Sequence, residues 1–262
     1  MLPARVTPLN GTRLRAGMFA ALFLVFLVPS ARADDTPSWF ERMLGRQQVV
    51  GSGKLQSQTR PAHGFNAVSV GGSMTVVLRQ GGREGVEVHA DDNLLPFIET
   101  TVEDGTLRIG VRKGVGYSTR NPVVVTVDLT RLDQLSLGGS GEVVGPGLQV
   151  AALSVSAGGS GRVHLPDLQA RALRVSLGGS GEVEASGTAQ RVELSVGGSG
   201  TVDAQALEAD EVSVSIGGSG DVSVHARRKL TASVAGSGDV VYRGDPAVER
   251  SIVGSGSVEK KR

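Results

Sequence analysis

The sequence LRVSLGGSGEVEA occupies residues 173–185. On both sides of its Gly-Ser-Gly tripeptide, apolar and polar residues alternate with a period of two, which is typical of β-strands with one buried face. An amphipathic helix would need apolar spacings of three and four, which this stretch does not have. The tripeptide recurs along the second half of the chain, with its serine at Ser140, Ser160, Ser180, Ser199, Ser219, Ser237 and Ser255.

Successive serines of this series follow one another at nearly equal intervals, and this register indicates structural units stacked on one another. A valine stands three positions after each serine, at Val143, Val163, Val183, Val202, Val222, Val240 and Val258. One repeat cannot bury its own apolar face, whereas stacked repeats close a narrow core. The sequence therefore predicts an all-β fold, a β-solenoid with about 20 residues per rung.

Each repeat is predicted to be a strand, a Gly-Ser-Gly bend, a second strand and a turn. Turn-forming pairs such as Pro166-Asp167 and Ser186-Gly187 stand where the turns are expected. Glycine in the bend permits positive φ angles and close approach of neighbouring rungs. We expect the bend serines to be structural, each hydroxyl bonding to a neighbouring rung or to the local backbone.

The composition limits the possible classes of protein. The chain has 262 residues, 38 of them glycine, only 3% aromatic residues and no cysteine, so disulfides cannot stabilise it. Its 27 basic and 26 acidic residues are balanced, which argues against a nucleic-acid-binding surface. Backbone hydrogen bonds are the expected source of stability.

The N-terminal segment 1–33 has the pattern of a secretory signal peptide. Arg5, Arg13 and Arg15 precede an apolar run over 16–28, and Ala31-Arg32-Ala33 supplies the small-residue cleavage site. We therefore predict cleavage after Ala33 and export to a bacterial periplasm or the extracellular space. The apolar run is shorter than a bilayer-spanning helix, which needs about 20 residues, so an uncleaved anchor is the weaker alternative. No membrane segment is predicted in the mature chain.

The mature chain divides into four parts. Residues 34–60 form a linker or N-terminal strand segment, in which Gly51-Ser52-Gly53 is interpreted as an early copy of the bend. The solenoid domain spans 61–258 and has two parts. In its first part, 61–130, apolar and polar residues alternate as in strands but without the 20-residue repeat; we expect this part to cap or extend the stack and to contain a short helical turn or loop near 91–98. The repeat part is 131–258. Residues 259–262 form a charged tail, expected to discourage end-to-end pairing.

Several motifs in this order are similar to a known family. They are Phe65, Val68-Ser69-Val70-Gly71, Val76-Val77-Leu78-Arg79-Gln80-Gly81, Ala90-Asp91-Asp92-Asn93-Leu94-Leu95 and Asp104-Gly105-Thr106-Leu107, followed by the Gly-Ser-Gly series. Together they resemble the GIN head domain of auto-transporter adhesins, over about residues 61–258. The resemblance implies a β-helical domain of an exported bacterial protein, and it supplies no catalytic residues.

The motifs that resemble a glycosidase site or a calcium-binding site lack features that these sites require. Glu142 and Glu182 stand two rungs apart, about 9.6 Å, which is at the far edge of the separation for inverting glycosidases. Tyr242 is the only aromatic residue after residue 130, which leaves no platform for sugar rings. Asp221 and Asp239 have the wrong phase and period for a calcium-binding β-roll.

Metal and phosphate sites are not predicted either. The four histidines fall at unrelated registers, at His63, His89, His164 and His225. Gly51-Ser52-Gly53-Lys54 lacks the first glycine and the final serine or threonine of a phosphate-binding loop. The sequence thus predicts no catalytic, cofactor-binding or metal-ligating residue, and no cofactor.

Three functions remain from these observations. The leading hypothesis is a non-enzymatic exported module that presents a flat Ser/Gly-rich surface to a protein, a cell-envelope polymer or a second copy of itself. The alternative is a periplasmic structural or envelope-maintenance scaffold. A polysaccharide-acting solenoid enzyme is the least favoured.

Overall fold

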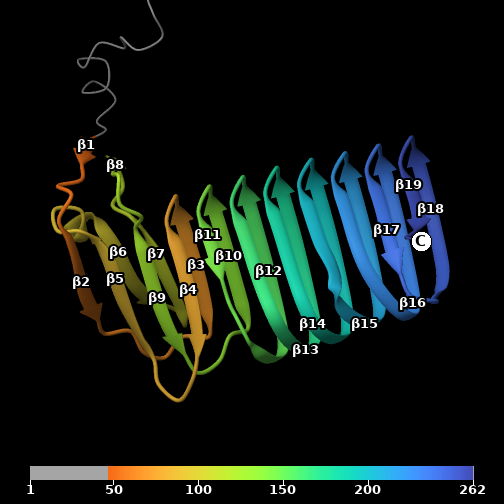
Figure 1. Ribbon diagram of the computed structural model, residues 1–262, viewed down its shortest axis with the longest axis horizontal. Coiled ribbons are helices and arrows are strands. Elements are labelled where there is room, and N and C mark those ends of the chain that lie inside the picture. The colour runs from red at the N-terminus through yellow and green to blue at the C-terminus, as the bar shows by residue number, and fades with distance from the viewer. Residues whose placement is uncertain (1–46, 262) are drawn as a thin grey trace, which may run out of the picture.

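The computed structural model describes residues 47–261, in which the chain winds into a β-solenoid of about 6 turns (Figure 1). The predicted all-β fold and the rung of roughly 20 residues are confirmed. The repeat part consists of β10 (Gln134–Gly139), β11 (Glu142–Val144), β12 (Gln149–Gly159), β13 (Arg162–Gly179), β14 (Glu182–Gly198), β15 (Thr201–Gly218), β16 (Asp221–Gly236), β17 (Asp239–Arg243), β18 (Ala247–Gly254) and β19 (Ser257–Lys260).

Neighbouring rungs pair in parallel, and the register stacks residues of the same type on one another. Val163, Val183, Val202 and Val222 are stacked in consecutive rungs and are at most 1% exposed. The alternation seen in the sequence therefore separates inward apolar columns from outward polar ones. The core is a narrow stack of such columns with backbone hydrogen bonds running from rung to rung.

The prediction that a turn ends the second strand of each repeat is wrong, because the long strands continue through these positions. At Pro166-Asp167 the pairing of β13 with β14 shifts register between Leu165 and Leu168 without ending the strand. Asp167 adopts a φ of 58° and Gly187 a φ of 116°, so the chain turns the corner by local backbone rotation. Rung-to-rung hydrogen bonds on both sides then hold the corner inside the sheet.

The first part of the domain contributes the remaining strands. They are β1 (Gln47–Val50), β2 (Leu55–Arg60), β3 (Ala67–Gly72), β4 (Thr75–Gln80), β5 (Gly85–Asp91), β6 (Ile98–Glu103), β7 (Thr106–Val111), β8 (Val115–Ser118) and β9 (Val124–Leu129). The short helical turn expected near 91–98 is a 3-10 helix, η1 (Leu95–Phe97).

A rung without the Gly-Ser-Gly tripeptide, which the sequence pattern does not predict, lies at the start of the solenoid. β3 and β4 stack on β10 and β11, with Gly72 opposite Gly139 and Val76 opposite Val143. Its bend is Gly72-Ser73-Met74, in which methionine replaces the last glycine. The interpretation of Gly51-Ser52-Gly53 as the early bend is wrong, because that tripeptide lies between β1 and β2, outside the stack.

The segment between this rung and the next closes the N-terminal end of the solenoid. On one side, β7 adds in parallel to β3 and β6 adds antiparallel to β7. On the other side, β9 adds in parallel to β4, and β5 and then β2 continue the sheet in antiparallel pairs. The expectation that 61–130 caps and extends the stack agrees with this arrangement.

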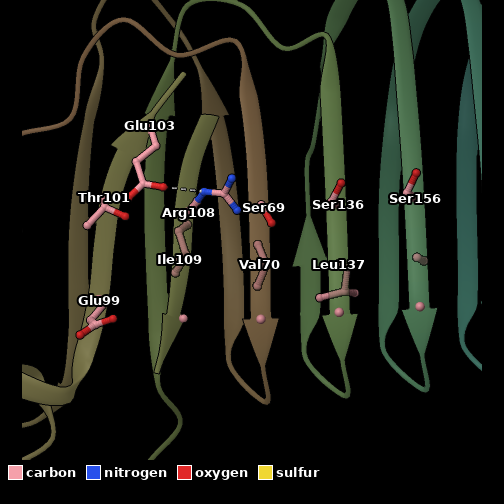
Figure 2. Close-up of a pocket in the computed structure, with 15 residues that line it drawn as sticks. Ser69, Val70, Glu99, Thr101, Glu103, Arg108, Ile109, Ser136, Leu137 and Ser156 are labelled. Atoms are coloured by element: carbon pink, nitrogen blue, oxygen red, sulfur yellow. Dashed lines mark ion pairs between the residues drawn. The ribbon is translucent and has the colours of Figure 1, made fainter. Parts of the chain in front are cut away.

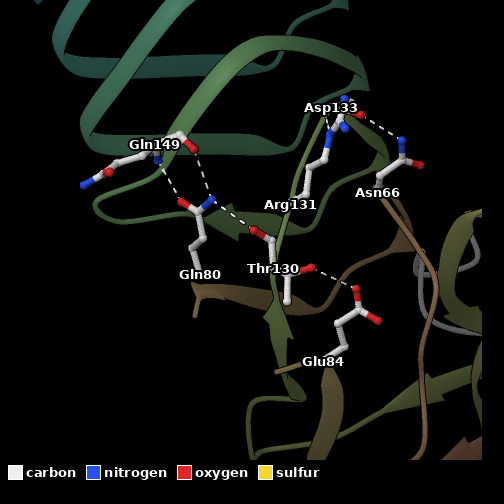
Figure 3. Close-up of polar contacts among 7 residues, drawn as sticks. All are labelled: Asn66, Gln80, Glu84, Thr130, Arg131, Asp133 and Gln149. Carbon is white, nitrogen blue, oxygen red and sulfur yellow. Dashed lines mark hydrogen bonds and ion pairs between the residues drawn. The ribbon is translucent and has the colours of Figure 1, made fainter. Parts of the chain in front are cut away.

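Side-chain hydrogen bonds join the N-terminal segment to the repeats (Figure 3). The Gln80 amide accepts from the backbone N–H of Gln149 at 2.8 Å and donates to its carbonyl at 3.1 Å, as a neighbouring strand would. Asp133 accepts from Asn66 at 2.7 Å and from Arg131 at 2.8 Å. These contacts fix the connection that leads from β9 into β10.

The signal peptide predicted at 1–33 lies outside the described residues. Within 47–261 the structure has no helix long and apolar enough to cross a membrane. Glu259 and Lys260 of the predicted charged tail belong to β19, opposite Val241 and Tyr242 of β17.

Candidate binding face

One broad side of the solenoid carries a column of serines and a column of glycines on its outer surface, next to a column that contains the ion pair of Arg174 and Glu193. It is formed by β3, β10, the last parts of β12 to β16, and β18, which lie side by side (Figure 1). The serine column consists of Ser69, Ser136, Ser156, Ser176, Ser195, Ser215, Ser233 and Ser251, and the glycine column of Gly71, Gly138, Gly158, Gly178, Gly197 and Gly217. We call these two columns the Ser/Gly face.

The glycines of this face are not required by the backbone. A Cβ atom added at Gly158 would meet no atom within 4 Å, and the same holds at Gly178. By contrast, the next residue, Gly159, has a φ of 99°, and a Cβ there would lie 2.5 Å from the carbonyl oxygen of Gly139. The bend therefore requires glycine at position 159. At position 158 a larger residue would fit, and the glycine there serves only to keep the face flat.

The bend serines form a second exposed ladder at the corner next to this face. The backbone N–H of Ser160 donates to the carbonyl of Gly139 at 2.9 Å, and Ser180 bonds to Gly159 in the same way. The contact to the neighbouring rung is thus made by the backbone, not by the hydroxyl as expected. The hydroxyls of this ladder are exposed to solvent.

A groove runs along the N-terminal end of the Ser/Gly face (Figure 2). Its floor is the outer surface of β7, β3, β10 and β12, and β6 borders it with Glu99, Thr101 and Glu103. The groove has a volume of about 760 Å³ and is open to solvent. Arg108 of β7 pairs with Glu103 across 3.1 Å, so the charges beside the groove largely neutralise one another.

The two glutamates considered for sugar chemistry belong to an ion-pair column on another side. Arg162 occupies the rung between Glu142 and Glu182, and its Nε lies 2.8 Å from the carboxylate of Glu182. The hydrogen bond and charge of Glu182 raise the pKa of Arg162, with smaller contributions from Glu142 and Glu184. The arginine therefore separates the two carboxylates on the solenoid surface and forms an ion pair with one of them.

Histidines and aspartates are dispersed over the described residues. His164 contacts Glu184 at 2.8 Å, and His89 contacts Ser57 at 3.0 Å on a different part of the sheet. Asp239 accepts a hydrogen bond from the backbone N–H of Ser257 at 2.9 Å. Within 47–261, no three histidine, aspartate or glutamate side chains lie close enough to hold a metal ion.

The solenoid geometry and its order of motifs agree with a known family. A sequence model described as "Putative auto-transporter adhesin, head GIN domain" matches residues 64–246. The chain belongs to this family. The resemblance carried by the motifs of 65–107 and the Gly-Ser-Gly series is thereby confirmed, and the match spans most of this GIN-domain chain.

Solved structures share the architecture of this GIN domain. A "putative adhesin" from Bacteroides fragilis NCTC 9343 is 28% identical, with 81% of this chain and 100% of that chain covered and a TM-score of 0.75. A "putative lipid binding protein" from Parabacteroides distasonis ATCC 8503 is 30% identical, with 82% and 100% covered and a TM-score of 0.70. A "putative adhesin" from the same organism is 25% identical, with 82% and 100% covered and a TM-score of 0.66. No curated protein matches the chain.

Proposed function

We propose that this GIN domain is a non-enzymatic, exported adhesion module that binds an envelope partner through the Ser/Gly face. The observation that carries the proposal is the flatness of this face over six neighbouring strands, β3, β10 and β12 to β15, where the serine and glycine columns run together. Its glycines, such as Gly158 and Gly178, could accept a side chain without a clash, yet none is present. Membership of a family described as adhesins supports the same assignment.

The chemistry of the face favours an uncharged, hydroxyl-rich polymer such as an envelope glycan. Serine hydroxyls repeat along it at the rung spacing of about 4.8 Å, and each can donate and accept hydrogen bonds. The glycine column lets a flat ligand approach the backbone closely. The two columns carry no charge, so recognition through them would depend on hydrogen bonds and contact area instead of ion pairing.

Other features support an adhesive role over a catalytic one. The carboxylates of Glu142 and Glu182 flank Arg162 on the solenoid surface instead of facing each other across a cleft. The groove at β6 is open and is bordered by the paired charges of Arg108 and Glu103. Export is supported by the arginines, the apolar run and the small-residue site of segment 1–33.

The test is retention of the purified chain on isolated bacterial envelope material. Gly178→Arg raises a long charged side chain from the middle of the Ser/Gly face, and we expect this variant to lose most of its retention. Thr188→Arg adds the same side chain at an exposed position on another side of the rung, opposite Gln169 and Glu208, and it should bind like the parent.

Two outcomes would contradict the proposal. Equal retention of the two variants and the parent would place binding on another surface. A parent chain that is retained neither by envelope glycans nor by envelope proteins would favour the structural-scaffold alternative. Equal melting temperatures of the two variants would show that any difference in retention is not caused by unfolding.

A further inference from the structure

The C-terminal end of the solenoid leaves two strands at the edge of the stack. β18 pairs with β16, and β19 pairs with β17; within 47–261 no strand lies beyond them (Figure 1). The outer N–H and C=O groups of such edge strands can pair with a strand of another molecule. β18 also exposes three large apolar residues, Val248 at 37%, Ile252 at 37% and Val253 at 72%.

Arg250 stands in the middle of this edge, at a position that belongs to the core. The register sets Val248 opposite Leu230, Arg250 opposite Ala232 and Ile252 opposite Val234. Leu230, Ala232 and Val234 are all buried, so these are the inward columns of the solenoid. Arg250 is thus a charged residue where the preceding rung carries alanine.

The guanidinium of Arg250 reaches the second edge strand. Its Nη1 donates a hydrogen bond to the carbonyl of Val258 on β19 at 3.2 Å. The side chain therefore extends from one sheet to the other across the open end of the core. An inward-pointing charge on an edge strand is a known means of preventing edge-to-edge association.

We propose that the two strands at this end can pair with the same strands of a second copy of the chain, and that the charge of Arg250 prevents this pairing in the parent protein. Two copies related by a two-fold axis would pair β18 antiparallel with β18 of the second copy. When Arg250 lies on the axis, Val248 of each copy faces Ile252 of the other on the core side of the sheet. The same register sets the two Arg250 side chains directly opposite each other, and like charges so placed are destabilising.

Neighbouring registers do not give this apolar match. A shift that keeps inward residues inward moves the axis to Glu249 or to Ser251. Arg250 then faces Val248 in the first case and Ile252 in the second. The best-matched pairing of the two edges is therefore the one that the charge of Arg250 opposes.

The first test removes this charge and measures self-association by analytical ultracentrifugation. We expect Arg250→Val to dimerise at least about tenfold more tightly than the parent, since a like-charge contact is replaced by an apolar one. Arg250→Ala restores the residue type of the preceding rung and should also dimerise more tightly than the parent. If both variants stay as monomeric as the parent at high concentration, the proposal is overturned.

The second test reverses the charge and depends on the register. Arg250→Glu alone should remain monomeric, whereas a mixture of Arg250→Glu with the parent should form a one-to-one dimer. Arg227→Glu makes the same change of charge at an exposed position of β16 and should not dimerise with the parent. A mixture that stays monomeric, or that associates equally well with Arg227→Glu, would contradict the two-fold pairing.

Discussion

Two neighbouring glycines of one rung have opposite physical roles. Gly159 has a left-handed φ of 99°, and an added Cβ would lie 2.5 Å from the carbonyl oxygen of Gly139, whereas Gly158 has free space around it. We expect Gly159→Ala to lower the free energy of unfolding by more than about 1 kcal/mol. Gly158→Ala should be neutral or slightly stabilising, because alanine restricts the unfolded chain.

Urea unfolding of these two variants beside the parent measures the difference. Equal losses of stability in both would contradict the distinction between bend glycines and surface glycines. A large loss in Gly158→Ala alone would contradict the geometry of the face itself.

The stacked valines permit a second prediction at the residue scale. Val183 is fully buried between Val163 and Val202. Val183→Asp would bury a carboxylate without a partner and should cost several kcal/mol, which is a large part of the stability of an ordinary domain. Ser176→Asp, at an exposed position between Ser156 and Ser195, is the control. A Val183→Asp variant that melts within a degree or two of the parent would contradict the register.

At the scale of elements, Asp91 at the end of β5 organises the N-terminal cap. Its side chain is buried and accepts hydrogen bonds from Thr119 at 2.6 Å, from Asn121 at 2.7 Å and from the backbone of Gly53. The hydrogen bonds from Thr119 and Asn121 hold the pKa of Asp91 below its usual range. One carboxylate thus connects three segments of the cap.

The lowered pKa fixes the sign of a pH dependence. Because the folded state favours the ionised carboxylate, its contribution is complete above the ordinary aspartate pKa of about 3.9 and is lost as the pH falls through the lower folded value. We expect Asp91→Asn to be less stable than the parent at pH 7, and the difference to narrow on acidification. Hydrogen exchange of the β2 and β5 amides over this pH range measures the stability of the cap in the variant and in the parent. A difference in stability that does not change with pH would contradict the prediction.

The repeated elements were predictable from the sequence because each rung copies the one before it. The first rung was not, because the whole segment 74–139 separates Ser73 from Ser140 and Met74 stands in place of the last bend glycine. The continuous strand through Pro166-Asp167 was also missed, because turn-forming residues do not distinguish a corner inside a sheet from a turn that ends a strand. In parallel rungs, hydrogen bonds from both neighbours override that local preference.

The candidate face was predictable only in part. The polar columns that alternate with the core residues indicated a flat Ser/Gly surface. The border of the groove depends on the antiparallel addition of β6 to β7, a long-range pairing that leaves no repeat in the sequence. The position of Arg250 in an inward column required the register of β18 on β16.

At the scale of the whole molecule, we predict that the N-terminal segment 1–33 is removed on export. The apolar run of 16–28 and the small residues Ala31-Arg32-Ala33 predict a mature chain that begins at Asp34. Mass spectrometry of the protein recovered from the periplasm or the medium measures this end directly. A product that still begins at Met1 would contradict the predicted cleavage.

The central claim, that the GIN domain binds through the Ser/Gly face, can be tested directly because the chain has no cysteine of its own. Ser176→Cys places one thiol on the face, and Thr188→Cys places one thiol on another exposed side of the rung. The measurement is the rate of maleimide labelling of each variant, free and bound to envelope material. We predict that binding slows the labelling of Ser176→Cys and leaves that of Thr188→Cys unchanged; protection of Thr188→Cys alone, or of neither, would contradict the claim.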